Sequence, residues 1–361
     1  MEIDRNKPFN QLAPLPPKEE IESISILKKA TSSHRYLAEL KGFANTIPNQ
    51  KILINSLILQ EARSSSEIEN VMTTNTKLFK AFSASTQKVD PQTKEVLRYR
   101  EALWTGYNRL KKRSIFSTNL FIDIFRIIKK TDEGIRTNPG TRIADGRGKI
   151  VYSPPEGNRI IKNKLKELEE FIRNDKDKID PLVKLALVHY QFEAIHPFTD
   201  GNGRTGRIMN VLYLVYKELL DLPILYLSQY IIGRKAEYYR LLRGVTFKQE
   251  WEPWILYMLN AIEKTSISTK EKILQIRDQL DETVEKARQN LPPNIYSKEL
   301  IELLFEQPYC KVQLVVDKGI AKRQTAAVYL DKLVKIGILK KIKVGKENLF
   351  LNKKLYEILK T

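Results

Sequence analysis

Residues 196–207, HPFTDGNGRTGR, concentrate the side chains of this sequence that are best suited to chemistry. An imidazole such as that of His196 has an ordinary pKa of about 6.5 and accepts a proton near neutral pH. Asp200 offers hard carboxylate oxygens, which Mg²⁺ binds together with water and phosphate. Arg204 and Arg207 are three residues apart and share a helical face, from which guanidinium groups bind phosphate oxygens. These residue types predict a nucleotide phosphate held beside a general base.

The elements that position this stretch follow from apolar periodicity. Residues 181–195 are apolar at nearly helical spacing, so we expect a helix that runs into the motif and stops at Pro197. Residues 208–215 predict a second helix with one buried face. Residues 201–203, Gly-Asn-Gly, then lie where a loop enters a helix, and free backbone N–H groups at such a point favour an anion.

Taken singly, each of these residues also fits a structural role, since Asp-Gly-Asn-Gly runs are usually turns. Together they resemble the motif HxFx(D/E)GNGRxxR of the Fic-domain family of AMP-transferring enzymes, with every motif position intact. The resemblance implies that His196 deprotonates the target hydroxyl group, that Phe198 anchors the loop and that Asp200 binds Mg²⁺. It also implies that ATP is bound through its phosphates. The α- and β-phosphates would be bound by Gly201, Asn202 and Gly203, the β-phosphate also by Arg204, and the γ-phosphate by Arg207.

Residues 64–70, SSSEIEN, form a second informative stretch. Their Ser and Glu spacing satisfies the capping box of a helix start, which would explain them without any further role. They also resemble the inhibitory pattern (S/T)xxxE(G/N) of the Fic family at Ser65, Glu69 and Asn70. The resemblance implies a salt bridge from Glu69 to Arg207, which would occupy the donors that the γ-phosphate needs. The chain would then restrain itself through an N-terminal helix.

Residues 140–155 contain an Asp-Gly pair between apolar runs, which predicts a β-hairpin. A plain surface hairpin is one interpretation. In the Fic family a flap at this place binds the target segment by strand addition, which would here involve Ile150, Val151 and Tyr152.

Tyr239 and Leu242 are spaced so that they share one face of a predicted helix. They resemble the adenine-pocket positions of the Fic family. Plain core packing explains them equally well.

Composition bounds the class of protein. The chain has 361 residues and a formal net charge of +19. Its single cysteine excludes an internal disulfide framework, and its three histidines are too scattered in the sequence to favour a zinc cluster. Residues 1–17 are polar and proline-rich and do not resemble a signal peptide, and no segment is expected to span a membrane. A cytoplasmic enzyme fits best. The positive charge favours acidic partners, although a lysine-rich solvated surface explains it equally well.

The pattern predicts a mainly α fold with four parts: an N-terminal arm with the inhibitory helices (1–90), a catalytic core (91–265), a helical linker (266–288) and a winged-helix domain (289–361). The last part carries 14 Lys and Arg against 7 Asp and Glu. The start of its predicted recognition helix is formed by Lys322, Arg323, Gln324 and Thr325. Four lysines lie on the predicted wing: Lys340, Lys341, Lys343 and Lys346. Nucleic-acid binding is one interpretation. Docking or packing within the chain is favoured.

The resemblance predicts a protein adenylyltransferase that transfers AMP from ATP, with Mg²⁺, to a protein hydroxyl group, including its own. The alternatives are transfer of phosphocholine, UMP or phosphate on the same fold, removal of AMP, and a nucleotide-sensing DNA-binding regulator. The sequence identifies neither the target protein nor the trigger that relieves inhibition. It leaves a homodimer open.

Overall fold

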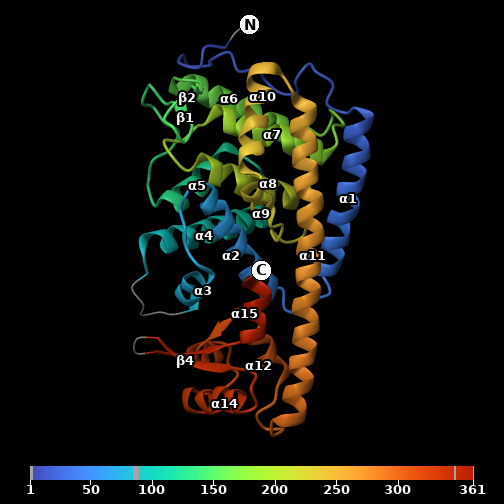
Figure 1. Cartoon of the computed structure of the whole chain (residues 1–361), viewed down its shortest axis with the longest axis vertical. Coiled ribbons are helices and arrows are strands. Elements are labelled where there is room, and N and C mark those ends of the chain that lie inside the picture. Colours follow the sequence, from blue (N-terminus) through green and yellow to red (C-terminus); the bar gives the residue numbers. More distant parts are fainter. Residues whose placement is uncertain (1–2, 84–88, 345–346, 361) are drawn as a thin grey trace.

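The computed structural model describes residues 3–83, 89–344 and 347–360. One helix, α11 (Trp251–Asn290), runs along most of the long axis of an elongated molecule (Figure 1). Its 40 residues extend about 60 Å at 1.5 Å per residue. A helical body lies against its upper part and a smaller domain against its lower part. The predicted mainly α fold is confirmed.

The body is built from ten helices and one hairpin within the described residues. In chain order they are α1 (Ile24–Ala44), α2 (Lys51–Ile68), α3 (Asn75–Ser83), α4 (Pro91–Lys112), α5 (Thr118–Lys129), β1 (Ile143–Ala144), β2 (Ile150–Tyr152), α6 (Asn158–Arg173), α7 (Pro181–Ile195), α8 (Asn202–Tyr216), α9 (Leu227–Gly233) and α10 (Lys235–Lys248). The predicted hairpin is therefore present.

Helices α7 and α8 form the centre of the body. Helix α7 begins where the pattern predicts, because Pro181 occupies its first turn and the Asp180 carboxylate accepts hydrogen bonds from the N–H groups of Leu182 and Val183. Almost every residue of α7 is buried, as expected of a helix that is apolar on all sides. Trp254 of α11 donates from Nε1 to the carbonyl of Ala186 at 2.8 Å, so the long helix is fixed to this centre.

Helix α2 continues to Ile68 and contains most of the SSSEIEN stretch. The capping-box interpretation is wrong, because this stretch ends a helix. Asn70 has a left-handed backbone with φ 62°, and the N–H groups of Asn70 and Val71 each donate at 3.0 Å to the carbonyls of Glu67 and Ser66. This is a Schellman motif, whose left-handed position favours Gly or Asn. The helix therefore stops at Ile68, and the half-exposed Glu69 is its C-cap residue.

The smaller domain has the element order of a winged helix, as predicted. It consists of α12 (Lys298–Leu303), β3 (Tyr309–Cys310), α13 (Val312–Asp317), α14 (Arg323–Lys335), β4 (Lys340–Val344), β5 (Glu347–Leu351) and α15 (Lys353–Lys360). The antiparallel sheet has the order β3-β5-β4. The predicted turn of the wing includes Gly345 and Lys346, which lie outside the described residues. Helix α15 was not predicted. Helix α11 crosses the boundary expected at residue 265 without a break, and the domain limits remain a prediction.

The C-terminal domain packs against α2 and α3. Gln60 of α2 donates from Nε2 to the carbonyl of Leu359 at 2.9 Å. The Tyr356 hydroxyl lies 2.6 Å from the Thr76 hydroxyl, and the Tyr356 ring meets Phe79 edge to face at 6.2 Å. Packing within the chain, which the sequence favours for this domain, is therefore present on this side.

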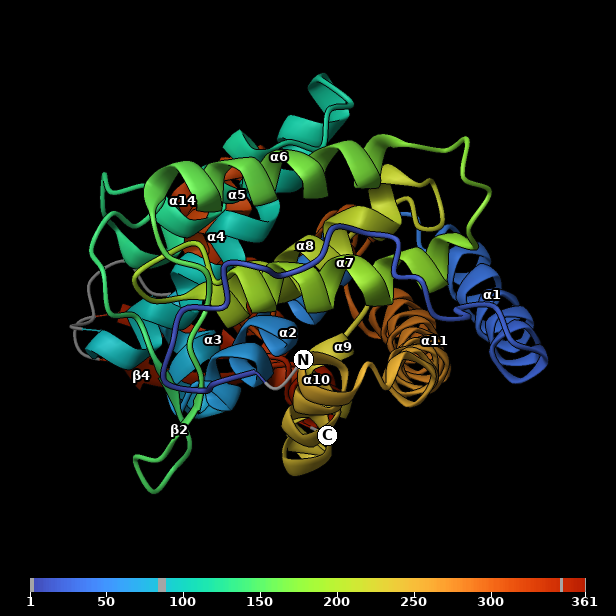
Figure 2. The ribbon, with the colours of Figure 1, turned by 90° about the horizontal axis from the view of Figure 1, so that it is seen from above.

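The N-terminal arm lies on the body, beside the hairpin and across α7 (Figure 2). The Phe9 N–H donates to the Ser153 carbonyl at 3.0 Å, next to β2. Further along, Lys164 donates to the carbonyl of Leu12, whose side chain is buried. The arm therefore covers apolar surface, which fixes a segment with few internal hydrogen bonds.

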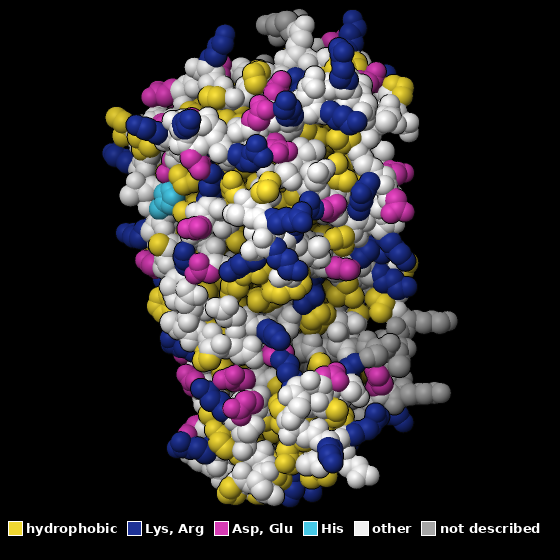
Figure 3. All heavy atoms as spheres, turned by 180° about the vertical axis from the view of Figure 1, so that it is seen from behind, with side chains coloured by type: hydrophobic (Ala, Val, Ile, Leu, Met, Phe, Trp, Pro, Cys, Tyr) yellow, Lys and Arg dark blue, Asp and Glu magenta, His cyan; other side chains and the backbone are white. Residues whose placement is uncertain are grey.

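The net positive charge is not gathered into one field on the face seen from behind. There, Lys and Arg side chains alternate with Asp and Glu, and apolar side chains are exposed at mid-height (Figure 3). Among the described residues, no helix is both long and apolar enough to cross a membrane.

We expect Tyr356→Ala to lower the free energy of unfolding by about 2 kcal/mol, less than the 3–5 kcal/mol of a fully buried aromatic ring. Tyr356→Phe, which removes only the hydroxyl contact with Thr76, should cost about 1 kcal/mol. Urea unfolding followed by circular dichroism measures both. Lys353→Ala, on the exposed side of α15, is the control. Equal values for Tyr356→Ala and this control would show that the contact does not hold the domain.

Candidate active site

His196 is the first residue after α7 and has a left-handed backbone with φ 49°. Its N–H still bonds to the Phe192 carbonyl, so the ring leaves the helix at a fixed angle. Nδ1 lies 3.4 Å from the carbonyl oxygen of Glu193. Because a carbonyl only accepts, this contact assigns the proton to Nδ1 and leaves the lone pair on Nε2. The half-buried ring is thus set up to receive a proton at Nε2.

The buried guanidinium of Arg136 fixes the loop that carries His196. It donates from Nε to the His196 carbonyl at 2.8 Å and from Nη2 to the Pro155 carbonyl, next to the hairpin. Burial first, and the Arg136 charge second, lower the pKa of His196 to about 4. The imidazole is therefore neutral at pH 7. Sequence reasoning missed Arg136, because its contacts are with residues about 20 and 60 positions away.

The rest of the loop is closed by Phe198 and Asn202. The buried Phe198 ring stacks on Phe125 of α5, with centroids 4.2 Å apart and planes 3° apart. The Asn202 side chain accepts from the Phe198 N–H at 2.8 Å and donates to the Phe198 carbonyl at 2.9 Å. Because both ends of the Asn202 amide are used in this way, its backbone N–H is the group that it offers to an anion.

Helix α8 begins after Gly201, whose φ of 78° is a left-handed conformation that suits glycine. Gly203, in the first turn, needs glycine for another reason. A Cβ atom there would lie 2.4 Å from Oε1 of Glu69 and 2.9 Å from Nη1 of Arg207. The Glu69 carboxylate therefore sits against the N-terminal turn of α8, where the helix dipole and the free N–H groups favour negative charge.

Arg207 is buried and binds the end of α2 with three hydrogen bonds. Its Nη2 donates to Oε1 of Glu69 at 2.7 Å and to the Ser65 carbonyl at 2.9 Å, and its Nε donates to the Ser65 hydroxyl at 2.8 Å. Burial favours the neutral acid, but the adjacent Arg207 charge outweighs it and lowers the pKa of Glu69. This is an ionised pair, and it joins the two stretches that the sequence singled out.

Four further contacts hold α2 against α4, α9 and α10. The buried Glu61 carboxylate accepts from the Ser228 N–H at 2.9 Å, from the Ser228 hydroxyl at 2.5 Å and from the Tyr99 hydroxyl at 3.1 Å. Lys235 donates to the Ile68 carbonyl at 2.5 Å, at the negative end of the α2 dipole. The end of α2 is therefore anchored on several sides.

A second charged network joins the motif residues Asp200 and Arg204 to α4 and α5. The buried Arg204 guanidinium pairs with Glu95 of α4, and Lys129 of α5 lies 2.5 Å from Asp200 Oδ2 and 3.7 Å from Glu95. Burial opposes ionisation of Asp200, but the hydrogen bond and charge of Lys129 outweigh it and lower the pKa of Asp200. Glu95 and Lys129 were not predicted as site residues. They are far from the motif in sequence, and no local pattern marks them.

The chemical properties of Asp200 are those expected of a Mg²⁺ ligand. It is ionised, its side chain is 65% exposed, and it already faces a positive charge, the ammonium of Lys129. No cluster of three or more His, Cys, Asp or Glu side chains among the described residues could hold a metal ion. A cation at Asp200 would therefore need water and phosphate to complete its shell, as is usual for Mg²⁺.

Glu193, in the last turn of α7, is a further carboxylate that the sequence analysis did not select. Burial raises its pKa to about 7. The Arg207 charge lowers this pKa, and the Glu69 charge raises it. Its Oε1 is buried without a hydrogen-bond partner among the described residues, and a Cβ atom on Gly206 would lie 2.6 Å from it. No local pattern marks it, because α7 also contains the polar residues Lys184, His189 and Gln191.

The remaining predicted residues occupy the rim of the site. Tyr239 and Leu242 are both half-buried on α10. Burial first, and the Glu69 charge second, raise the pKa of Tyr239 in spite of the Arg207 charge, which lowers it. Their role in an adenine pocket remains a prediction.

In the hairpin, Tyr152 points inward and donates from its hydroxyl to the Ala194 carbonyl at 3.0 Å. Tyr152 therefore ties the hairpin to the end of α7. Ile150 and Val151 are half-buried, and their backbone is the part left to meet another segment.

The predicted recognition helix, α14, lies at the far end of the molecule from the His196 loop (Figure 1). Its N-terminal residues are exposed, as are three basic residues of the wing strand β4. These exposed residues are Lys322, Arg323, Gln324, Thr325, Lys340, Lys341 and Lys343.

Comparisons with protein families place three known domains in series on this chain. Residues 27–108 match the N-terminal domain of the Fic/DOC family, and residues 115–214 match the Fic/DOC family itself. Residues 279–355 match the C-terminal domain described as that of a SoFic-like protein adenylyltransferase.

Curated relatives match over short segments. The chain is 39% identical over 87 residues to a probable protein adenylyltransferase of Aquifex aeolicus, which is 24% of this chain and 27% of the relative. It is 30% identical over 112 residues to the protein adenylyltransferase fic-1 of Caenorhabditis elegans, which is 31% of this chain and 20% of the relative. The matches thus span about a quarter of these relatives or less.

Solved structures agree over a larger share of the chain. A Fic family protein from Desulfovibrio desulfuricans aligns over 93% of this chain and 98% of its own, with a TM-score of 0.59 and 19% identity. Fic-1 of Caenorhabditis elegans aligns over 67% of this chain and 71% of its own, with a TM-score of 0.51 and 20% identity. At these identities the likeness shows the fold.

We predict that the His196 imidazole stays neutral down to about pH 4, as followed by nuclear magnetic resonance of ¹³C-labelled histidine. The buried His189 should titrate at about 3. Because the folded chain disfavours both protonated rings, their contribution to stability is full above the unfolded pKa of about 6.5 and is lost as the pH falls toward 4 and then 3. Arg136→Gln should raise the pKa of His196, whereas Arg142→Gln on the exposed hairpin should not. A His196 pKa near 6.5 in the unchanged protein would contradict the assignment.

Proposed function

The chain belongs to the Fic/DOC family, and we propose that it is a protein adenylyltransferase that transfers AMP from ATP to a hydroxyl group of a protein, itself included. One observation carries this proposal. An ionised carboxylate, that of Glu69, already lies between Gly203 and Arg207 at the start of α8. A site that binds carboxylate oxygens with a helix N-terminus and a guanidinium suits phosphate oxygens for the same reasons.

His196 would act as the general base. Its Nε2 would take the proton of the target hydroxyl group while the hydroxyl oxygen attacks the α-phosphorus of ATP. The bond from that phosphorus to the bridging oxygen breaks, and pyrophosphate leaves. A low pKa makes His196 a modest base, so most of the acceleration would come from positioning and charge stabilisation, as is usual in phosphoryl chemistry.

The first turn of α8 and the two arginines would hold the phosphates. Gly201, Asn202 and Gly203 would offer backbone N–H groups, while Arg204 would pair with the β-phosphate and Arg207 with the γ-phosphate. Asp200 would hold Mg²⁺, which neutralises phosphate charge when it is bound. Lys129 would have to leave Asp200 for this, and its ammonium would then be free to face the phosphates.

Glu69 and Ser65 would restrain this activity from within the chain. Together they occupy Nε and Nη2 of Arg207, so a γ-phosphate arriving there would find no free donor on those atoms and a negative charge beside it. ATP could bind only with its phosphates displaced from in-line attack. Release of the Glu69 contact would restore the site, and target segments would then align along Ile150 and Val151 by strand addition.

Other reactions on the same fold remain distinct in their products. Transfer of UMP, phosphocholine or phosphate would add a different mass to the target, and removal of AMP would use a water molecule aligned by Glu69. A DNA-binding regulator would use the exposed basic residues of α14, such as Arg323. The complete phosphate-binding motif favours transfer of AMP over these.

We expect Glu69→Gly to raise incorporation of AMP into the protein itself by about 5- to 150-fold, the range of an allosteric coupling of about 1–3 kcal/mol. The variant frees Arg207 while leaving the helix end able to adopt its turn. Incorporation of label from α-³²P-ATP measures the rate, and mass spectrometry of the product identifies the added group.

Glu67→Gly is the matched control, because Glu67 lies two residues earlier on the same helix end and pairs with Arg63 instead of Arg207. Glu67 lies inside the last turn, so glycine costs the helix at least as much there as at the C-cap residue Glu69, and Glu67→Gly should still leave the rate unchanged. Equal rates for Glu69→Gly and the unchanged protein would remove Glu69 from regulation.

His196→Ala in the Glu69→Gly background should abolish AMP incorporation while leaving ATP binding within about threefold, because the base makes no required contact with the phosphates. Isothermal titration calorimetry with a non-hydrolysable ATP analogue measures binding, and the labelling assay measures turnover. Retained incorporation in the double variant would show that another group accepts the proton.

A further inference from the structure

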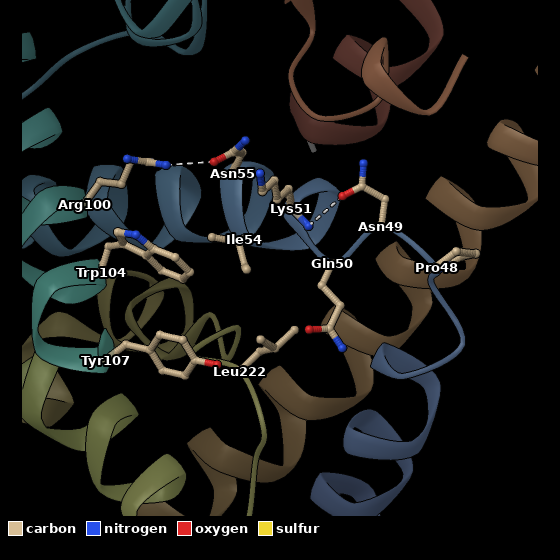
Figure 4. A pocket seen from close by; sticks show the side chains of 10 residues that line it. All are labelled: Pro48, Asn49, Gln50, Lys51, Ile54, Asn55, Arg100, Trp104, Tyr107 and Leu222. Atoms are coloured by element: carbon tan, nitrogen blue, oxygen red, sulfur yellow. Dashed lines mark hydrogen bonds between the residues drawn. The ribbon is translucent and has the colours of Figure 1, made fainter. Parts of the chain in front are cut away.

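A cavity of about 660 Å³ opens at the opposite end of α2 from Glu69, well away from His196. The start of α2, one face of α4 and the segment around Leu222 line it (Figure 4). Its volume falls within the range of small-molecule sites in proteins. The lining residues are Pro48, Asn49, Gln50, Lys51, Ile54, Asn55, Arg100, Trp104, Tyr107 and Leu222.

One part of the cavity is flat and apolar. The rings of Trp104 and Tyr107 stack on each other, with centroids 5.2 Å apart and planes 26° apart. Figure 4 shows both rings, together with Ile54 and Leu222, turned toward the open centre. The Tyr107 hydroxyl is already bonded to the Asp221 carbonyl, so the ring rather than the hydroxyl group faces a ligand. Such a wall suits a planar ring.

The other part of the cavity is positively charged. Lys51 and Arg100 both line it, and no Asp or Glu is among the lining residues. The half-buried Arg100 donates from Nη2 to Asn55 Oδ1 at 2.7 Å, a neutral partner, while its buried Nε has no hydrogen-bond partner among the described residues. Burial lowers the pKa of Arg100, and Glu101 offsets this only in part. Two cations in one cavity without an acid favour an anion.

The start of α2 borders the cavity. Its first turn contains no acidic residue and Gln50 makes no side-chain capping bond, but Asn49 Oδ1 accepts from the Lys51 N–H at 3.1 Å and Asn49 Nδ2 donates to Glu306 Oε1 at 2.9 Å. The positive charge of the cavity therefore comes chiefly from Lys51 and Arg100. The Gln50 amide and the Asn55 amide nitrogen supply further polar groups in the cavity.

We propose that this cavity binds a small planar anion, an aromatic ring bearing one carboxylate or phosphate group, with the ring against Trp104 and the anion between Lys51 and Arg100. Such a ligand bridges α2 and α4 in the arrangement where Glu69 contacts Arg207. A ligand that binds this arrangement better than a displaced α2 stabilises it, so occupancy holds the chain in its restrained state. This second statement rests on the proposed function, whereas binding itself does not.

Binding is tested on the full chain without ATP, using indole-3-acetate and phenyl phosphate as probes. Isothermal titration calorimetry should give a Kd on the order of 0.1–1 mM, as expected for ligands of this size. With phenyl phosphate, which has no indole emission of its own, quenching of tryptophan fluorescence reports the location, because Trp104 is the half-buried tryptophan and Trp251 and Trp254 lie in the core. The tighter probe identifies the preferred anion. The uncharged indole-3-acetamide should bind at least about tenfold more weakly.

Lys51→Gln and Arg100→Gln should each weaken binding about tenfold, and Trp104→Leu should remove the quenching. Lys112→Gln, exposed on the same α4 outside the cavity, is the matched control. Because Lys51 is exposed, Lys51→Gln should fold normally and can still test the site if Arg100→Gln disturbs packing. Absence of saturable binding by both probes, or binding that all three cavity variants leave unchanged, would overturn the site.

The link to α2 is tested separately by AMP incorporation at saturating probe. The unchanged protein should lose activity about fivefold or more, and the Glu69→Gly variant should not, because it lacks the restraint that the ligand strengthens. If neither protein shows any AMP incorporation, the proposed function fails and the binding result stands. If incorporation occurs and the bound probe leaves it unchanged, the link between the cavity and α2 is wrong.

Discussion

The structure depends on one buried guanidinium, that of Arg207, and on what satisfies its donors. A buried arginine without a partner costs several kcal/mol, so some anion or acceptor must lie beside it. Here the chain supplies the acceptors itself, from Ser65 and Glu69 at the end of α2. A triphosphate could supply them instead. Restraint and substrate binding therefore compete for the same atoms, and the position of α2 decides between them.

Helix α2 connects three parts of the molecule. Its start borders the cavity with Arg100 and Trp104, its middle bonds to the C-terminal domain through Gln60, and its end reaches Arg207. The 18 residues form a rod of about 27 Å, without glycine or proline to let one end move alone. A displacement of α2 at the cavity or at the C-terminal domain would therefore also move Glu69 relative to Arg207. The C-terminal domain would act here as a support for α2, whatever else α14 contacts.

The sequence predicts those parts of the site that depend on local pattern. Helix α7, the glycine-rich loop and α8 follow from periodicity and turn chemistry, and the winged-helix order follows from the same signals. Arg136, Glu95 and Lys129 escaped prediction because their partners in the 196–207 motif lie 60 or more residues away, where only the folded chain brings them together. The SSSEIEN stretch shows most clearly what local spacing cannot predict. Its spacing fits a helix start, but the left-handed Asn70 makes it a helix end.

A crystal structure with Mg²⁺ and a non-hydrolysable ATP analogue, determined for the unchanged chain and for Glu69→Gly, tests the competition for Arg207 most directly. The account predicts that in Glu69→Gly the γ-phosphate lies within hydrogen-bond distance of Arg207 and the α-phosphate faces His196 Nε2. In the unchanged chain, Glu69 should keep Arg207 and the terminal phosphate should be displaced. A γ-phosphate on Arg207 while Glu69 still holds it, or no nucleotide at α8 in either crystal, would contradict the account.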